Sequence, residues 1–144
     1  MQPINFEDVL NRMMEKSTRY HRDAYIFLKE ALEFTQKKIG KADKQTRHIT
    51  GPELLDGIRE YALEAFGPMA MTVFEEWGIK SCEDFGNMVF LMVENNLLRK
   101  TEQDSPDDFK KGYSFDEAFR EPFLPARKKE ADPVEPEQSK VEQN

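Results

Sequence analysis

The stretch FGPMAMTVFEEWGIKSCEDFGNMVF, residues 66–90, decides the fold class because it holds two helix-forming runs with signals for a tight turn between them. Pro68 suits the first turn of a helix, where its missing N–H is not needed. Gly78 can adopt the left-handed conformation that ends this helix, with Ile79 folding back onto Phe74 as in a Schellman motif. The stretch therefore predicts a helix-turn-helix.

The second helix of this motif is predicted to open at Ser81, because Ser81 and Asp84 match a capping box in which the two residues satisfy each other's backbone N–H groups. The helix is expected to end near Asn95 and Asn96. Trp77, in the last turn of the preceding helix, is expected to be structural and to cover the crossing of the two helices. The apolar positions of the second helix recur every three or four residues and are Phe85, Met88, Val89, Met92 and Val93.

The chain before this stretch predicts three more amphipathic helices. Asn5 is the expected N-cap of the first. The second and longest runs from about residue 18 to residue 39, with an apolar stripe along one face and charged residues on the other. The third opens at a capping box formed by Thr50 and Glu53 and stops at Gly67.

Downstream of the second motif helix, the pattern changes from helical spacing to partial alternation. LLRKTEQ (97–103) and GYSFDEAF (112–119) flank the polar segment DSPDDFKK (104–111). Two such runs around a polar tip predict a β-hairpin. The predicted fold is therefore mainly α, a helical domain with a helix-turn-helix and a C-terminal β-hairpin, which is a winged-helix-like arrangement.

Composition divides the chain into one domain and a tail. The 144 residues suffice for one domain with a sizeable core. After Pro125 the sequence is rich in Glu, Lys, Gln and Pro and has little to bury. We therefore expect a single mainly helical domain at 1–125 and a disordered charged tail at 126–144.

Charge, cysteine usage and hydropathy indicate a cytoplasmic protein. The net charge is −7, from 28 acidic and 21 basic residues, so general attraction to nucleic acid or to anionic membranes is not expected. Cys82 is the single cysteine, which excludes an internal disulfide framework and suits a reducing compartment. The N-terminus does not match a signal peptide, and no apolar run approaches the length that spans a bilayer.

Charge also argues against DNA as the target of the predicted helix-turn-helix. Such a motif lays its second helix in the major groove, and its binding relies on neutralising phosphates. Residues 51–98 contain two basic residues against nine acidic ones. Glu83 and Asp84 occupy the start of the presumed recognition helix. We therefore do not expect sequence-specific DNA binding.

The positive charge gathers instead in the segment that follows the long helix, where only Asp43 opposes it. One interpretation is contact with an acidic protein face, an RNA phosphate or an anionic ligand. The other is a solvated loop without a specific role. The residues of this basic cluster are Lys37, Lys38, Lys41, Lys44, Arg47 and His48.

A second candidate cluster consists of Tyr20, His21, Asp23 and Tyr25. A histidine one helical turn from a tyrosine could act in acid–base chemistry. A partly buried, hydrogen-bonded histidine is the structural alternative. Neither His21 nor His48 has the spacing of a helical metal-binding motif. No catalytic, metal-binding or cofactor-binding residue is therefore assigned.

Four segments of the chain resemble an uncharacterised family of short bacterial cytoplasmic proteins. They are YHRDAYIFLKEAL (20–32), HITGPELLDGIREYALEAFGPMAMTVFEEWGI (48–79), CEDFGNMVF (82–90) and DDFKKGYSFDEAF (107–119). The resemblance covers most of the expected domain. It implies a bacterial cytoplasmic protein, no established activity and no catalytic residues to transfer.

Three functional hypotheses follow. The leading one is a noncatalytic protein–protein interaction module of the bacterial cytoplasm, with a protein partner that the sequence does not identify. The first alternative is a nucleic-acid-associated regulator that uses the basic loop 37–48. The second alternative is an enzyme with an active site near His21.

Overall fold

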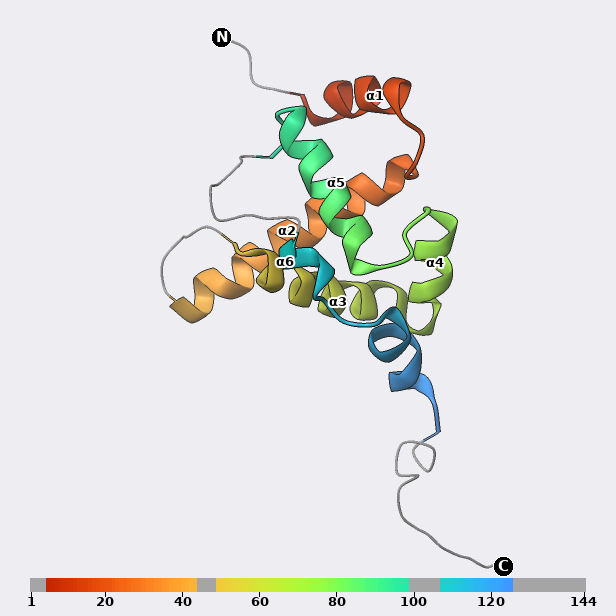
Figure 1. Cartoon of the computed structure of the whole chain (residues 1–144). Helices are drawn as coiled ribbons and strands as arrows, with labels where there is room; N and C mark the ends of the chain where they lie inside the picture. Colours follow the sequence, from red (N-terminus) through yellow and green to blue (C-terminus); the bar gives the residue numbers. More distant parts are fainter. Residues whose placement is uncertain (1–4, 44–48, 99–106, 126–144) are drawn as a thin grey trace, which may run out of the picture.

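The structure, a computed structural model, describes residues 5–43, 49–98 and 107–125. Within these ranges it is mainly helical and has no strand, which confirms the mainly α class (Figure 1). The predicted tail 126–144 lies outside the described residues. The elements are α1 (Phe6–Lys16), α2 (Arg22–Asp43), α3 (Gly51–Phe66), the 3₁₀-helix η1 (Gly67–Met69), α4 (Ala70–Glu76), α5 (Cys82–Glu94), α6 (Asp107–Lys110), the π-helix η2 (Asp116–Arg120) and the 3₁₀-helix η3 (Glu121–Phe123).

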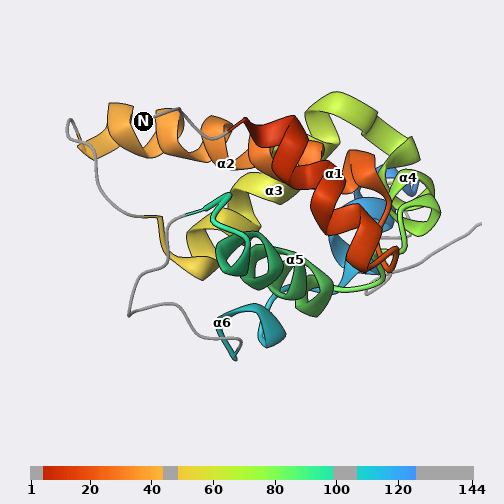
Figure 2. The same ribbon diagram turned by 90° about the horizontal axis from the view of Figure 1, so that it is seen from above.

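Helix α3 contacts α4, α5, α6, η1 and η2, and the long helix α2 packs against α3 (Figures 1 and 2). Helix α1 lies against the N-terminal half of α2, where Arg22 Nε donates to Asn11 Oδ1 at 3.2 Å. Lys29 Nζ lies 5.4 Å from the ring centroid of Phe6, the first residue of α1. No helix in the described part of the chain combines the length and apolar character needed to cross a bilayer.

The core is centred on Phe74 of α4, whose side chain is fully buried. Aromatic rings from four other elements surround it and meet it mainly edge to face, the arrangement that the ring quadrupoles favour. Its neighbours, with centroid separations of 5.2 to 6.4 Å, are Phe27, Phe66, Trp77, Phe85, Phe115 and Phe119.

The turn between α4 and α5 has the predicted Schellman geometry. Gly78 has a φ of 84°. The Ile79 N–H donates to the Phe74 carbonyl at 2.9 Å, and the Gly78 N–H donates to the Glu75 carbonyl at 3.1 Å. A Cβ at Gly78 would also lie 2.8 Å from the Arg19 carbonyl oxygen, so glycine is required here for close approach as well as for φ.

The predicted N-terminal caps are confirmed as well. Asn5 Oδ1 accepts a hydrogen bond from the Glu7 N–H at 2.9 Å, at the start of α1. At the start of α3, Glu53 Oε1 accepts from the Thr50 N–H at 3.0 Å, and Thr50 Oγ1 accepts from the Glu53 N–H at 3.2 Å. The capping box therefore satisfies donors that would otherwise have no partner within the helix.

Trp77 packs against α2 and α3 as well as against Phe74 of its own helix. Its half-buried ring lies 5.7 Å from Phe27 of α2 and 5.8 Å from Phe66 of α3. The expectation that Trp77 covers the crossing of the two motif helices did not include the rings from α2 and α3, which adjoin Trp77 because the long helix passes beside the end of α4. The ring packs on the core, in agreement with a structural role.

The predicted C-terminal hairpin, and with it the winged-helix-like arrangement, is wrong in the part that the structure describes. Residues 112–119 contain no strand, and their last positions belong to η2. A strand would place Glu117 on the same face as Phe115 and Phe119, whereas a helical turn brings the two rings together and turns Glu117 outward. Phe115 and Phe119 both pack on Phe74, at 5.7 and 5.2 Å, while Glu117 is exposed. Most of the other proposed strand, 97–103, lies outside the described residues.

Helices α2 and α3 approach each other closely at Gly57, which is buried against Thr35. A Cβ at Gly57 would lie 1.7 Å from Thr35 Oγ1 and 2.8 Å from Thr35 Cβ. The Thr35 hydroxyl is fixed because it donates to the Ala31 carbonyl at 2.7 Å within α2. The close packing of α2 against α3 therefore requires a residue without a side chain at position 57.

We expect Gly57→Ala to lower the free energy of unfolding by about 1 to 3 kcal/mol, although alanine is the better helix former, because the added methyl group overpacks the interface. Gly40→Ala is the matched control, since an added Cβ there meets nothing within 4 Å. It should raise stability by roughly 0.5 to 1 kcal/mol. Urea unfolding measures both, and equal shifts for the two variants would contradict the close helix contact.

Candidate functional site

Tyr20 and Tyr25 of the His21 cluster are core residues. Tyr20 is fully buried, and its hydroxyl donates to Asp84 Oδ1 at 2.6 Å and accepts from Asn87 Nδ2 at 3.3 Å. Tyr25 is 2% exposed and meets the Tyr20 ring edge-on at 6.3 Å. Burial is the main cause that raises the pKa of both phenols, that of Tyr20 to about 12. Both side chains are therefore neutral at physiological pH.

His21 and Asp23 lie on the surface, with side-chain exposures of 54% and 58%. His21 Nδ1 accepts from the Asp23 N–H at 3.0 Å, so the imidazole caps the start of α2. The helix consequently begins at Arg22, later than predicted. The hydrogen-bonded histidine of the structural alternative is present, but its expected partial burial is not.

The structure does not bring this cluster together as a catalytic site. Tyr25 lines a hollow of about 300 Å³ together with residues from the end of α1 and the end of α5, and His21 does not contribute to that lining. A general base has to lie within hydrogen-bond reach of its proton, directly or through one water. The imidazole of His21 is exposed to solvent and the phenol of Tyr25 is buried, so the two groups do not share one site.

Two side chains of the basic cluster, those of Lys37 and Lys38, lie in the described part of the chain. Lys37 and Lys38 are exposed near the C-terminal end of α2, and Lys38 Nζ forms an ion pair with Glu60 of α3. Lys41 is in α2, but its side chain lies outside the described part. Lys44, Arg47 and His48 lie outside the described residues.

Asp84 is a buried charged residue, and the capping-box prediction identified one of its two roles. Its Oδ2 accepts from the Lys80 N–H at 2.8 Å and from the Ser81 N–H at 3.2 Å, as a cap of α5 does. Its Oδ1 accepts from Tyr20, and Arg19 Nη2 lies 3.5 Å from the same oxygen. Asp84 thus joins the chain before α2 to the start of α5.

We expect the stabilising effect of the Tyr20 hydroxyl to disappear in alkali. Its pKa is raised from 10.0 to about 12, so the folded state holds this proton more tightly than the unfolded state. The contribution is fully present below pH 10.0 and is lost as the pH rises through about 12. The stability difference between parent and Tyr20→Phe should therefore shrink by about 2 to 3 kcal/mol over this range.

Urea unfolding of both proteins at several alkaline pH values measures this effect. Other alkaline titrations, including those of Cys82 and Tyr113, occur in both proteins and cancel in the difference. A difference that stays constant up to pH 12 would show that Tyr20 is not held neutral by its surroundings.

Cys82 is a structural thiol. It is 3% exposed, and its Sγ–H donates to the Tyr113 carbonyl at 3.4 Å. Burial raises the pKa of the thiol to about 11, which keeps it from forming the reactive thiolate near neutral pH. No group of three or more His, Cys, Asp or Glu side chains that could hold a metal ion occurs in the described ranges.

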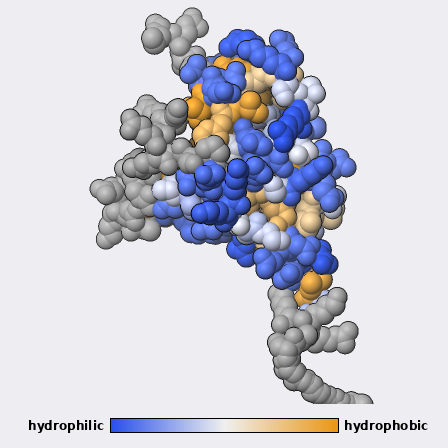
Figure 3. Space-filling model, viewed as in Figure 1, coloured by the Kyte–Doolittle hydropathy of each residue, from blue (hydrophilic) through white to orange (hydrophobic). Residues whose placement is uncertain are grey.

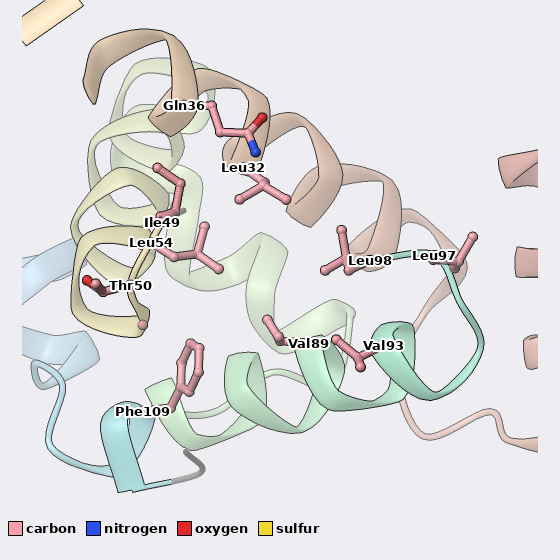
Figure 4. A pocket seen from close by; sticks show the side chains of 11 residues that line it. Leu32, Gln36, Ile49, Thr50, Leu54, Val89, Val93, Leu97, Leu98 and Phe109 are labelled. Atoms are coloured by element: carbon pink, nitrogen blue, oxygen red, sulfur yellow. The ribbon is translucent and has the colours of Figure 1, made fainter. Parts of the chain in front are cut away.

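A candidate feature for binding is a hollow of about 340 Å³ at the surface between α2, the start of α3, α5 and α6, lined mainly by apolar side chains. We call it the aliphatic hollow. Figure 4 shows its side chains directed into a common space, with Gln36 at one end and Phe109 at the opposite end. Its size falls within the range of about 300 to 1,000 Å³ that is typical of ligand sites. The apolar lining includes Leu32, Leu54, Val89, Val93, Leu98 and Phe109.

The end of α5 shapes one wall of the aliphatic hollow. Asn96 has a φ of 65°, and the Leu97 N–H donates to the Met92 carbonyl at 2.8 Å, which is the helix-ending geometry in which asparagine replaces glycine. The chain therefore reverses, and Leu97 and Leu98 also line the hollow. In the space-filling view, apolar surface gathers over this end of α5 (Figure 3).

The sequence patterns included the residues that line the aliphatic hollow but did not predict the hollow itself. Val89 belongs to the buried core, as predicted, and Val93 is half-buried beside it. Leu97 and Leu98 were assigned to a strand. The asparagine pair at residues 95–96 indicated that the helix ends there. After this end the chain reverses, so the side chains of Leu97 and Leu98 lie against α5.

Comparison of the chain with family models, curated proteins and solved structures gave no match. The resemblance to a bacterial family is therefore neither supported nor contradicted by these comparisons. The residues that line the aliphatic hollow are the basis on which a function can be argued.

Proposed function

We propose that this chain is a noncatalytic protein–protein interaction module of the bacterial cytoplasm, and that its partner docks in the aliphatic hollow. The bacterial cytoplasmic location is taken from the family resemblance. The single observation that carries the interaction is the hollow itself, a surface concavity lined by aliphatic side chains from several helices. Concave apolar pockets of this kind accept the anchor residues that dominate binding energy.

The chemistry of the lining favours binding over catalysis. Among the residues that border the aliphatic hollow, the polar side chains are those of Gln36 and Thr50, and neither titrates near neutral pH. Thr50 Oγ1 already accepts the Glu53 N–H in the cap of α3. An apolar side chain of a partner gains the most from such a surface, because its burial removes apolar area from water on both sides.

The two alternatives receive less support. The imidazole of His21 caps α2 on the surface, which does not favour an active site there. For a nucleic-acid regulator, the described part of the basic cluster supplies Lys37 and Lys38, and Lys38 already pairs with Glu60. We therefore keep protein interaction as the leading function.

The test compares three forms of the protein as baits in a bacterial lysate: parent, Leu98→Glu and Met69→Glu. Leu98 is half-buried and lines the hollow, whereas Met69, which is 55% exposed, lies in η1 and does not line it. A carboxylate in the hollow should reduce capture of the bound protein about tenfold or more, whereas Met69→Glu should leave capture unchanged.

Melting curves of the three baits control for unfolding. Equal capture by parent and Leu98→Glu, with equal melting temperatures, would exclude the aliphatic hollow as the docking site. If the parent retains no protein more strongly than Leu98→Glu does, the aliphatic hollow is likewise excluded as the docking site.

A further inference from the structure

The buried hydroxyl of Tyr25 has no hydrogen-bond partner in the described part of the chain. The side chain is 2% exposed, yet its hydroxyl neither donates to nor accepts from any described residue. The phenol of Tyr20, which is also buried, donates to Asp84 and accepts from Asn87. Because an unpaired buried donor is costly, the Tyr25 hydroxyl calls for a partner that is not part of the fold.

Tyr25 lies in the wall of a hollow of about 300 Å³ that shares no lining residue with the aliphatic hollow. We call it the tyrosine hollow. Its volume is at the lower limit of ligand sites, which suits a small molecule. We propose that it binds a small zwitterion, an amino acid or a related aminocarboxylate, a role that does not rest on the proposed function. The other lining residues are Met13, Lys16 and Ser17 from the end of α1, and Leu91, Glu94 and Asn95 from the end of α5.

The α1 side of the tyrosine hollow supplies the groups that a carboxylate needs. Burial raises the pKa of the Tyr25 phenol, so this group keeps its proton and can donate it. Ser17 Oγ accepts from the Arg19 N–H at 3.4 Å, which leaves the Ser17 proton for a ligand. Lys16 is exposed and has no carboxylate within ion-pair distance among the described residues. A carboxylate gains most from these groups, because hydrogen bonds to an ionised acceptor are the stronger ones.

The α5 side suits an ammonium group. A helix ends with unpaired carbonyl groups and a partial negative charge, which attract a cation. Helix α1 has Lys16 in its last turn to offset this charge, whereas α5 has no basic residue in its last turn and carries Glu94 there. Glu94 also has no ion-pair partner in the described ranges. Asn95 Nδ2 donates to the Leu91 carbonyl at 2.8 Å, which leaves Asn95 Oδ1 as a further acceptor.

The two sides together match an α-amino acid. One lysine and one glutamate line the tyrosine hollow, and an amino acid carries one charge of each sign with no net charge. Met13, which is buried, and Leu91, which is half-buried, add apolar surface for a small aliphatic side chain. L-Valine is therefore a suitable probe.

Chemical-shift titration of the isotope-labelled full chain with L-valine tests the proposal. Valine should bind with saturation and shift the backbone signals of Ser17 and Asn95. Valinamide, which lacks the carboxylate, should bind about tenfold more weakly, and isovalerate, which lacks the ammonium group, about twofold to fivefold more weakly. Equal binding of all three, or no saturable shift with valine, would overturn the proposal, and the second result would leave water as the partner of Tyr25.

Substitutions assign the contacts. Tyr25→Phe removes only the hydroxyl and should weaken valine about tenfold. Glu94→Gln should weaken valine about twofold to fivefold and leave isovalerate unchanged, with Glu83→Gln as the exposed control on the same helix. Leu98→Glu should leave valine binding unchanged. If Leu98→Glu abolishes valine binding and Tyr25→Phe does not, the probe binds in the aliphatic hollow and the proposal is wrong.

Thermal unfolding of the ligand-free chain gives a second readout. Tyr25→Phe should leave the melting temperature unchanged or raise it by a few degrees, because it removes an unpaired buried donor. Tyr20→Phe is the matched control and should lower the melting temperature, because the Tyr20 hydroxyl is paired within the fold. Equal losses for the two variants would show that the Tyr25 hydroxyl serves the fold and not a ligand. Lysate capture should be the same for Tyr25→Phe and the parent, so the proposed function is tested separately.

Discussion

Replacing Phe74 by alanine should lower the free energy of unfolding by about 3 to 5 kcal/mol, the range found for large aromatic residues truncated in well-packed cores. Phe74 is fully buried, and its ring meets six other aromatic rings from α2, α3, the end of α4, α5 and the C-terminal segment. Rings of this size cannot move together to fill the space, so a cavity should remain. A protein of this size has a total stability of about 5 to 15 kcal/mol, and the loss would be a large part of it.

Phe123→Ala is the matched control, because Phe123 is the same residue type and is 45% exposed in η3. Its truncation should change stability by less than about 1 kcal/mol. Urea unfolding followed by Trp77 fluorescence measures both variants, and it also reports on packing because Trp77 lies 6.2 Å from the Phe74 ring. Similar losses for the two phenylalanines would contradict a core centred on α4.

The helix ends were predictable because their signals are local. At Gly78 and at Asn5 the residue type, the required backbone conformation and the hydrogen-bonding partner all lie within a few positions of one another. Such motifs form in much the same way in any tertiary context. The mainly α class followed from these ends and from the apolar spacing between them.

The C-terminal segment was assigned wrongly because its pattern fits two periods. Tyr113, Phe115 and Phe119 are compatible with alternation, and Phe115, Ala118 and Phe119 are compatible with a helical turn. Contact with Phe74, which lies about forty residues earlier in the sequence, decides between them. Short apolar runs leave this choice to tertiary packing.

The candidate site was less predictable than the fold for a related reason. The His21 cluster was grouped by closeness in sequence, but the start of α2 directs Tyr20 inward and leaves His21 at the surface as a cap. The aliphatic hollow is formed by elements distant in sequence, and its lining residues look like ordinary core residues. Likewise, nothing in the sequence distinguishes Gly57, against which Thr35 packs, from the open Gly40.

Asp84→Ala should lower the free energy of unfolding by about 3 to 5 kcal/mol, because it removes the acceptor for one buried and two half-buried donors at once. The Tyr20 hydroxyl and the Lys80 and Ser81 N–H groups all donate to this carboxylate. Each buried donor left without a partner costs about 1 to 3 kcal/mol, and water at the start of α5 should relieve part of the total. Thermal and urea unfolding of the full chain measure the loss.

Glu83→Ala is the matched control, since Glu83 is exposed in the same first turn of α5 and loses only its interaction with the helix dipole, less than about 1 kcal/mol. The double-mutant cycle with Tyr20→Phe then separates the two tasks of Asp84. In the Tyr20→Phe background, Asp84→Ala should cost about 1 to 2 kcal/mol less, because the phenol is no longer left unpaired. The remaining cost belongs to the cap of α5. Additive losses in this cycle would mean that Asp84 only caps its helix and does not hold the chain before α2 against α5.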